Sequence, residues 1–204
     1  MKHQESGNAL HPWLHFKTIT KHKWMVMKYC FRIGLYKQGL LHDLSKYAPE
    51  EFLVGCRYYQ GYRSPNNAER EDRGVSMAWL HHKGRNKHHY EHWVDYSLDA
   101  DTVIAGARMP RKYVAEMIMD RISASRNYMG EAYTDQAPLA YYMKSKDRLW
   151  FIHKDTKREL EGFLRMLAEK GEDRTLAYIR KVYLKKPEKH GKSMDRRRQK
   201  RTRG

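Results

Sequence analysis

The sequence predicts an all-α fold, on three observations. Apolar residues recur at helical spacing in several segments, no segment alternates strictly between apolar and polar residues, and no hairpin signal joins two β-branched stretches. The 204 residues are 40% hydrophobic and 12% aromatic, which is enough to build one core. We therefore expect one helical domain over residues 1–184 and a separate tail over residues 185–204.

The first helices are marked by their boundary residues. A helix is expected to begin near His11 and to continue until Gly34 interrupts it. Residues 39–46 are expected to form a buried helical turn. Pro49 opens another helix that runs towards Tyr59, because proline suits a helix first turn and the two glutamates behind it complement the helix dipole.

The second half of the chain continues the helical pattern. Residues 61–74 are polar and are expected to form a loop. A helix resumes at Met77 and ends near Gly84, and Asn86 is expected to cap a further helix through Trp93. The remaining helices are expected from Pro110 past Ile122, at 139–146, at 156–170 and at 175–184.

The composition also limits location and partners. The chain has no apolar run of about 18 residues, and residues 1–24 lack the apolar core of a signal peptide, so we expect a cytoplasmic protein without a membrane contact. Cys30 and Cys56 fit no zinc or redox spacing and are expected to be packed thiols. The tail carries ten Lys or Arg and two acidic residues, so we expect it to be disordered, with either a nucleic-acid partner or a solubilising role.

Histidine is concentrated in one string. Five of the 12 histidines lie between His81 and His92, in HHKGRNKHHYEHW. Neutral imidazole and carboxylate together are ligands for Mn, Fe, Co, Ni or Zn, and ligand histidines need outer partners that fix the ring. The string can supply both kinds of group. Helix capping, ring packing or exposed cationic histidines are the alternative.

The adjacent pair His42-Asp43 is a second signal. It lies among three leucines, Leu40, Leu41 and Leu44, and an ionisable pair in apolar surroundings must be paired or metal-bound to offset its desolvation. With His22 before it, the string after it and Asp120 on a later helix, the ionisable residues follow the order H, HD, HH, HH, D.

This order resembles the HD superfamily of metal-dependent hydrolases, whose motif runs His, His-Asp and a distant Asp on separate helices of an all-α bundle. HDLSK at 42–46 is similar to the HDIGK-type element of members that hydrolyse cyclic dinucleotides or RNA. HKW at 22–24, AWLHHKGRNKHHYEHW at 78–93 and MPRKYVAEMIMD at 109–120 also look like a family of uncharacterised HD-like proteins. The resemblance covers roughly residues 20–125. The chain lacks the GYP-type signature, and its histidines are less dispersed than in that superfamily.

The resemblance implies one or two divalent transition-metal ions. The first would be held by His22, His42, Asp43 and Asp120, with Asp43 suited to bridging, and the second by His81, His82, His88 and His89. Lys46 would lie near phosphate, and Asp43, Lys46 and Glu116 would serve the chemistry, Glu116 as a base or by holding a ligand histidine. Arg85, Asn86 and Arg121 would contact substrate, although both arginines also suit an ordinary surface.

The expected function is a metal-dependent phosphohydrolase acting on a nucleotide or another phosphate ester. The same ligands would also suit an HD-type diiron oxygenase. A nucleic-acid-binding protein with a structural metal is the alternative from another class, supported by the basic tail. The metal, the substrate and the oligomeric state stay open.

Overall fold

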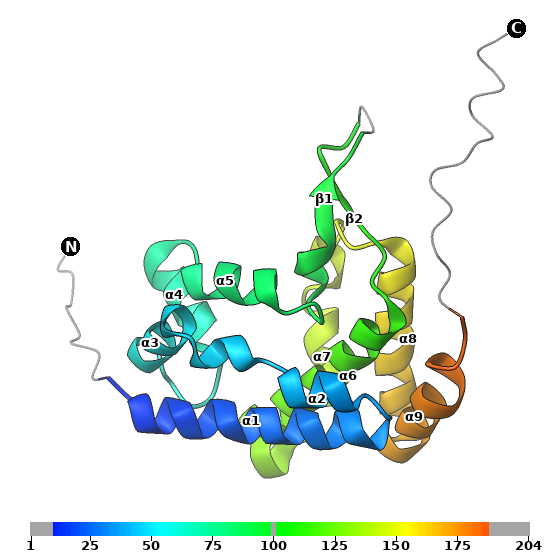
Figure 1. Cartoon of the computed structure of the whole chain (residues 1–204), viewed down its shortest axis with the longest axis horizontal. Coiled ribbons are helices and arrows are strands. Elements are labelled where there is room, and N and C mark those ends of the chain that lie inside the picture. Colours follow the sequence, from blue (N-terminus) through cyan, green and yellow to red (C-terminus); the bar gives the residue numbers. More distant parts are fainter. Residues whose placement is uncertain (1–9, 99–100, 188–204) are drawn as a thin grey trace, which may run out of the picture.

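Helices dominate the structure, as predicted. The computed structural model describes residues 10–98 and 101–187 (Figure 1). The α-helices are α1 (Pro12–Arg32), α2 (Tyr36–Leu41), α3 (Pro49–Arg57), α4 (Pro65–Arg73), α5 (Met77–Arg85), α6 (Arg111–Met129), α7 (Ala137–Met143), α8 (Lys154–Lys170) and α9 (Glu172–Tyr178). Short 3-10 turns are η1 (Leu44–Tyr47), η2 (Tyr90–Trp93), η3 (Gly130–Ala132) and η4 (Lys146–Arg148), and η5 (Ile179–Tyr183) is a π-helical turn. Two strands, β1 (Val94–Tyr96) and β2 (Ile104–Gly106), complete the list.

The long helix α6 forms the centre of the core. Val114, Ile118 and Ile122 are fully buried, and α6 packs against both α1 and α8. Leu160 and Leu164 of α8 are also fully buried against this cluster. Because α6 is covered on most of its circumference, its polar residues near the middle lie inside the protein.

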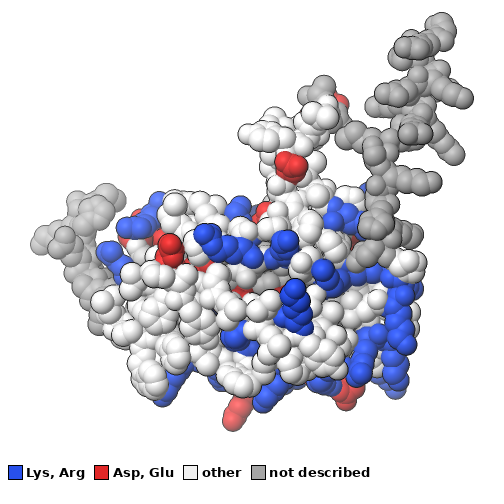
Figure 2. All heavy atoms as spheres, in the orientation of Figure 1, with Lys and Arg blue, Asp and Glu red and all other residues white. Residues whose placement is uncertain are grey.

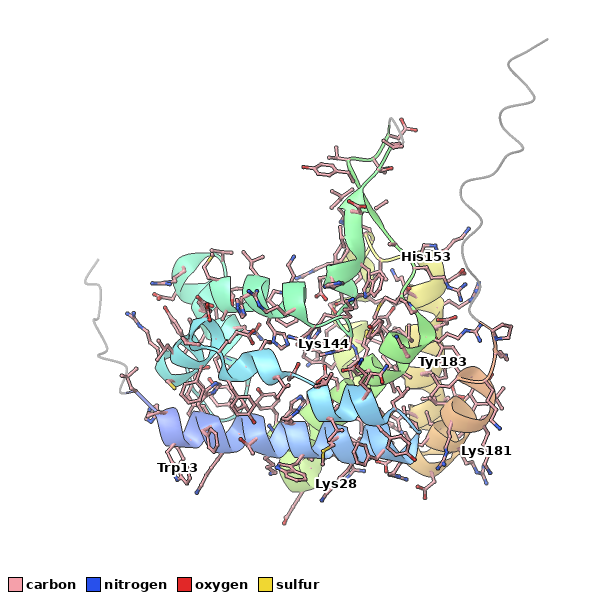
Figure 3. All side chains as sticks on the ribbon, in the orientation of Figure 1. Trp13, Lys28, Lys144, His153, Lys181 and Tyr183 are labelled. Atoms are coloured by element: carbon pink, nitrogen blue, oxygen red, sulfur yellow. The ribbon has the colours of Figure 1, made fainter. Side chains whose placement is uncertain are left out.

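The helices α1 and α2 approach each other closely. A Cβ atom on Gly39 would lie 3.0 Å from the Cβ of Cys30 and 3.2 Å from the backbone of Met27, so a larger residue would push α2 away. In Figure 3, Trp13 and Lys28 project from the side of α1 that faces away from α2. The opposite side of α1 is therefore the one that faces the interior.

The C-terminal helix α9 is tied to α1 and α6 by a polar cluster. Glu172 accepts hydrogen bonds from Tyr29 at 2.6 Å, from Arg126 at 2.8 Å and from Arg32. Burial alone would raise the pKa of Glu172, but these three hydrogen bonds outweigh it and hold that pKa below its usual value. The carboxylate is thus ionised where the three helices meet.

The predicted loop over residues 61–74 is wrong, because it contains α4. Pro65 occupies the first turn of this helix, and Gly74 follows it with φ 75°. Proline at the start and glycine just past the end are typical of a helix as well as of a loop. The fully buried Glu69, which accepts a hydrogen bond from Ser76, anchors α4 to the start of α5.

The helix expected through Trp93 is also wrong. Only the turn η2 is helical there, and the chain then forms β1, which pairs antiparallel with β2 in the register Val94↔Gly106. Figure 1 shows this hairpin rising from the helical body. Its foot is tight, because a Cβ on Gly106 would lie 2.3 Å from the carbonyl oxygen of Phe151, just before α8.

Other boundaries shift by a few residues. Helix α5 continues past Gly84 to Arg85, so that Asn86 is the C-cap of α5 and does not begin the next helix. Cys30 and Cys56 lie buried as free thiols. No helix within residues 10–98 and 101–187 has both the length and the apolar character to cross a membrane. Most of the predicted tail, residues 188–204, lies outside the described residues.

Candidate metal centre

A break in the helical chain brings His42 and Asp43 together. Helix α2 ends at Leu41, and Asp43 has φ 53°, the only positive φ at a non-glycine residue in the described chain. Consecutive residues of an α-helix point about 100° apart, so a regular helix would separate these two side chains. Aspartate is among the residues that tolerate the left-handed conformation. Both side chains are 2% exposed or less, so the break directs the pair into the interior.

The expected burial among leucines is wrong. Leu40, Leu41 and Leu44 are 55%, 52% and 48% exposed. The pair is buried instead by polar side chains from α1, α5 and α6, because the chain turns inward at His42 and the leucines flank the turn on its outside.

One group of ligand atoms surrounds the Oδ2 side of Asp43. It combines His22 of α1, His42, Asp43 and Asp120 of α6, whose ligand atoms all lie within 4.8 Å of one another. His22 Nε2 is 3.0 Å from Asp120 Oδ1 and 3.6 Å from Asp43 Oδ2. His42 Nε2 is 3.3 Å from the same Asp43 oxygen. These are the four residues expected around a first ion.

A second group surrounds the Oδ1 side of Asp43. It combines Asp43 with His82, His88 and His89, again within 4.8 Å. His82 Nε2 and His88 Nε2 each lie 3.4 Å from Asp43 Oδ1, and His82 Nε2 is 2.9 Å from His89 Nε2. One carboxylate therefore faces both groups, one oxygen to each, which is the arrangement of a bridging ligand.

Two glutamates hold the rings of these histidines from outside. Glu116 Oε1 lies 2.9 Å from His42 Nδ1 and 3.3 Å from His88 Nδ1. Glu51 Oε2 lies 2.7 Å from His82 Nδ1. Because an ionised carboxylate only accepts hydrogen bonds, each of these Nδ1 atoms must carry a proton, and Nε2 is the ring atom that faces the centre.

The unsatisfied atoms of the centre fit a cation. Among the buried side-chain atoms without a hydrogen-bond partner in the described chain are Nε2 of His22, His42 and His88 and both carboxylate oxygens of Asp43. Lys46 forms an ion pair with one of these atoms, Asp43 Oδ2. Buried polar atoms normally have partners, so the other four around one point call for an explanation. Imidazole nitrogen and carboxylate oxygen are the donor set that Mn, Fe, Co, Ni and Zn take.

The ionisation of the acidic groups also fits a cation. Burial alone would raise the pKa of Asp43, but His42 and Lys46 outweigh it and hold that pKa well below its usual value. The neighbouring imidazoles of His22 and His42 outweigh burial in the same way and hold the pKa of Asp120 well below its usual value. Both carboxylates are thus ionised.

The histidines differ in their ionisation. Burial lowers the pKa of His82 and His89, which keeps both imidazoles in the neutral form that binds metal. Burial also opposes the charge of His42, but Asp43 and the other carboxylates around it outweigh this and raise its pKa well above the usual value. A metal ion that binds His42 would therefore displace a proton.

Lys46 lies at the edge of the centre. Its Nζ is 2.7 Å from Asp43 Oδ2, and its side chain is 28% exposed. Burial would lower the pKa of Lys46, but the charge of Asp43 raises it above the usual value, so the ammonium form persists. A cation thus sits between the ligand atoms and the outside.

Several expected site residues belong to neither ligand group. His81 belongs to neither ligand group, because its Nδ1 hydrogen-bonds Glu51 Oε1 at 2.6 Å and its ring turns towards Glu50. Arg85 is exposed at the end of α5. Asn86 is buried and donates to the His82 carbonyl oxygen at 2.8 Å and to Ser45 Oγ at 2.7 Å, so it braces the loop. The guanidinium of Arg121 lies 5.7 Å from the centre of the Tyr90 ring.

The role of Glu51 could not be predicted from the sequence. It follows Pro49 in the first turn of α3, where an acidic residue is typical in any case. Only the fold shows that it is 7% exposed and reaches two histidines of α5.

Residues 11–166 match a family of unknown function, DUF5662. The chain belongs to this family. The part matched to DUF5662 extends from the start of α1 into α8 and contains both ligand groups and their two glutamates. No curated protein and no solved structure matches the chain.

Proposed function

We propose that this DUF5662 member is a metal-dependent phosphohydrolase with two divalent transition-metal ions that share Asp43. The observation that carries the proposal is the pair of ligand groups on the two oxygens of one buried carboxylate. When bound, two such ions would lower the pKa of a shared water and stabilise the attacking and leaving oxygens of a phosphoryl transfer.

The residues of the chain have separate tasks in this proposal. Asp43 offers one oxygen to each group, and Glu116 and Glu51 keep the imidazole Nε2 atoms directed at the centre. Lys46 supplies an ammonium group for a phosphate oxygen, because it borders the ligands and is partly exposed. The likeness of HDLSK to the corresponding HD element supports the same role for Lys46.

Elemental analysis of the purified protein tests the metal site. We expect about two equivalents of metal in the wild type and a loss of metal in His42→Ala and Asp120→Ala, since each variant removes one ligand. His92→Ala is the matched control, because His92 lies in the same histidine string but outside both groups, with its Nδ1 at 3.1 Å from the Lys83 carbonyl oxygen. Equal metal content in all four proteins would overturn the proposal.

Metal-stimulated phosphate release tests the chemistry. We expect the loaded wild type to release phosphate from p-nitrophenyl phosphate, and Lys46→Met to retain the metal while losing most of this activity. A Lys46→Met variant that works as well as the wild type would remove Lys46 from the mechanism.

The number of imidazoles favours a second candidate function. Five histidines in the two groups face only two carboxylates, and such nitrogen-rich ligation also suits iron. A diiron oxygenase would use the same residues. Anaerobic loading with iron followed by oxygen-uptake measurements separates the two, because an oxygenase requires a redox-active metal, whereas hydrolysis also proceeds with zinc.

A nucleic-acid-binding protein would need exposed Lys and Arg side chains to contact phosphate groups. Figure 2 shows Lys and Arg side chains spread over several elements of the visible face. If the full chain binds nucleic acid through the tail, the salt dependence of binding should be steep and should become shallower without residues 185–204.

A further inference from the structure

The hairpin of β1 and β2, residues 94–106, exposes apolar side chains above the helical body (Figure 1). Its strands have three residues each, and an isolated two-stranded hairpin is at best marginally stable in water. Four of its large apolar side chains are nonetheless exposed: Tyr96 at 81%, Leu98 at 95%, Val103 at 74% and Ile104 at 36%. Tyr96 and Ile104 are register partners, so they share a face. Exposed apolar groups gathered in this way mark an interaction surface.

The hairpin also differs in charge from the rest of the chain. Residues 94–106 contain three aspartates, Asp95, Asp99 and Asp101, and no Lys or Arg, whereas the whole chain carries a net charge of +17. Figure 2 shows the described part of the hairpin in white and red, above a body on which Lys and Arg are spread. A partner of the hairpin should therefore combine apolar side chains with positive charge.

The outer face of α1 combines these two properties. Four exposed residues recur there at helical spacing and form one stripe, named the Trp-Lys stripe: Trp13, Lys17, Trp24 and Lys28. The two tryptophans are 62% and 56% exposed, and the ring of Phe16 stacks beside Trp13 with the ring centres 5.9 Å apart. Helix α1 contains no acidic residue, so no carboxylate of its own neutralises these lysines.

We infer that the hairpin of one molecule docks on the Trp-Lys stripe of a second copy of this chain. The apolar side chains of the hairpin would cover the tryptophans, and its aspartates would face the lysines. One contact thus accounts for both exposed surfaces. An anionic membrane or a nucleic acid would suit the stripe alone, because both repel an acidic hairpin.

The hairpin and the stripe lie on opposite sides of the molecule. In Figure 3 the hairpin rises from one side of the body, and Trp13 and Lys28 project from the other. A molecule therefore does not dock its own hairpin on its own stripe. The contact between two copies is head-to-tail, and such a contact can repeat into a ring or an open chain.

Two double variants of the full chain, each lacking one surface, test the inference. Tyr96→Ser/Leu98→Ser removes apolar side chains of the hairpin, and Trp13→Ser/Trp24→Ser removes the rings of the stripe. In sedimentation velocity, the wild type should form species larger than a monomer as its concentration rises. Each variant should associate at least about 30-fold more weakly, which is the typical loss when a central tryptophan of an interface is removed. All four side chains are exposed, so metal content and melting temperature should stay unchanged.

A mixture of the two variants tests the head-to-tail geometry. The stripe variant keeps an intact hairpin, and the hairpin variant keeps an intact stripe, so the mixture should form a dimer with one copy of each and no larger species. Tyr62→Ser/Tyr141→Ser is the matched control, because these tyrosines are 65% and 64% exposed and belong to neither surface. The control should associate as the wild type does.

Three results would each overturn the inference: a wild type that stays monomeric at every concentration, double variants that associate as well as the wild type, or a mixture in which the two variants do not combine. Wild-type binding to phosphatidylglycerol vesicles or to single-stranded DNA that is lost in the stripe variant, with no association in the mixture, would assign the stripe to that partner and also overturn the inference.

Discussion

The variant Glu51→Gln should weaken metal binding in the second ligand group and leave the first group unchanged. Glu51 is 7% exposed, and its two oxygens lie 2.6 Å from His81 Nδ1 and 2.7 Å from His82 Nδ1. Burial raises the pKa of Glu51, but the hydrogen bonds from His82 and His81 outweigh it and bring the pKa below its usual value, so both oxygens are acceptors. A glutamine keeps the shape of the side chain but offers only one acceptor oxygen to two imidazole N–H groups.

The size of the effect follows from this loss. Removing an outer partner of a ligand histidine typically weakens metal binding by about 10–100-fold, or about 1.4–2.7 kcal/mol. We expect the upper end for the ion beside His82, because the variant removes the charge and leaves one N–H unpaired. The ion beside His22 should keep its affinity, since the first ligand group does not include a residue that contacts Glu51.

Titration with a competing metal chelator measures both affinities, and elemental analysis gives the stoichiometry. Glu50→Gln is the matched control, because the neighbouring Glu50 is 62% exposed and lies 3.9 Å from His81 Nε2. Equal weakening of both ions in Glu51→Gln, or no weakening of either, would refute the assignment of Glu51 to the second group.

Three further predictions concern packing and pH. Gly55→Ala should destabilise the fold by about 1–3 kcal/mol in urea unfolding, because the new Cβ would lie 2.0 Å from His15 Nε2. Gly162→Ala is the control: its Cβ would meet nothing within 4 Å, and alanine suits the interior of α8, so it should stabilise the fold by up to about 1 kcal/mol. Equal effects of the two variants would contradict this. Metal affinity should fall as the pH is lowered, because the raised pKa of His42 means that the metal-free protein holds a proton on this imidazole. Calorimetry of metal binding in buffers of different ionisation enthalpy should detect the release of that proton. Binding without proton release would argue against His42 as a ligand. Because the pKa of Glu172 is lower in the folded state, its ionised form stabilises the fold above the usual glutamate pKa of about 4.3, and this stability is lost as the pH falls towards the folded-state value. The free energy of unfolding of Glu172→Gln should therefore depend less on acid pH than that of the wild type. An identical pH dependence would refute this.

The order of ionisable residues along the chain was the most informative feature of the sequence. The resemblance that this order carries implies His22, His42, Asp43 and Asp120 as ligands, and the structure brings these four together. The string that begins at His81 within α5 indicated a dense set of imidazoles, but not which of them face Asp43. Adjacent histidines point in different directions, so the fold alone decides that His82 turns to the centre and His81 to Glu51.

The parts that the sequence did not predict depend on contacts between distant segments. Glu51 is an ordinary helix carboxylate until α3 docks beside the histidines. The hairpin of β1 and β2 could not be predicted, because three-residue strands are too short to show an alternation of apolar and polar residues. Helix α4 was not predicted, because its residues are almost all polar and only Ala68 and Glu69 are buried.

The positions of His22 and Asp120 have a consequence for folding. They lie on α1 and α6, with α2 to α5 between them in the chain. An ion held by both would close a long loop of the unfolded polypeptide, as a disulfide does in secreted proteins, and a cross-link over a long loop removes much chain entropy. Both cysteines are free thiols, so such an ion would be the cross-link between these distant segments. Its removal would lower the melting temperature as well as the activity.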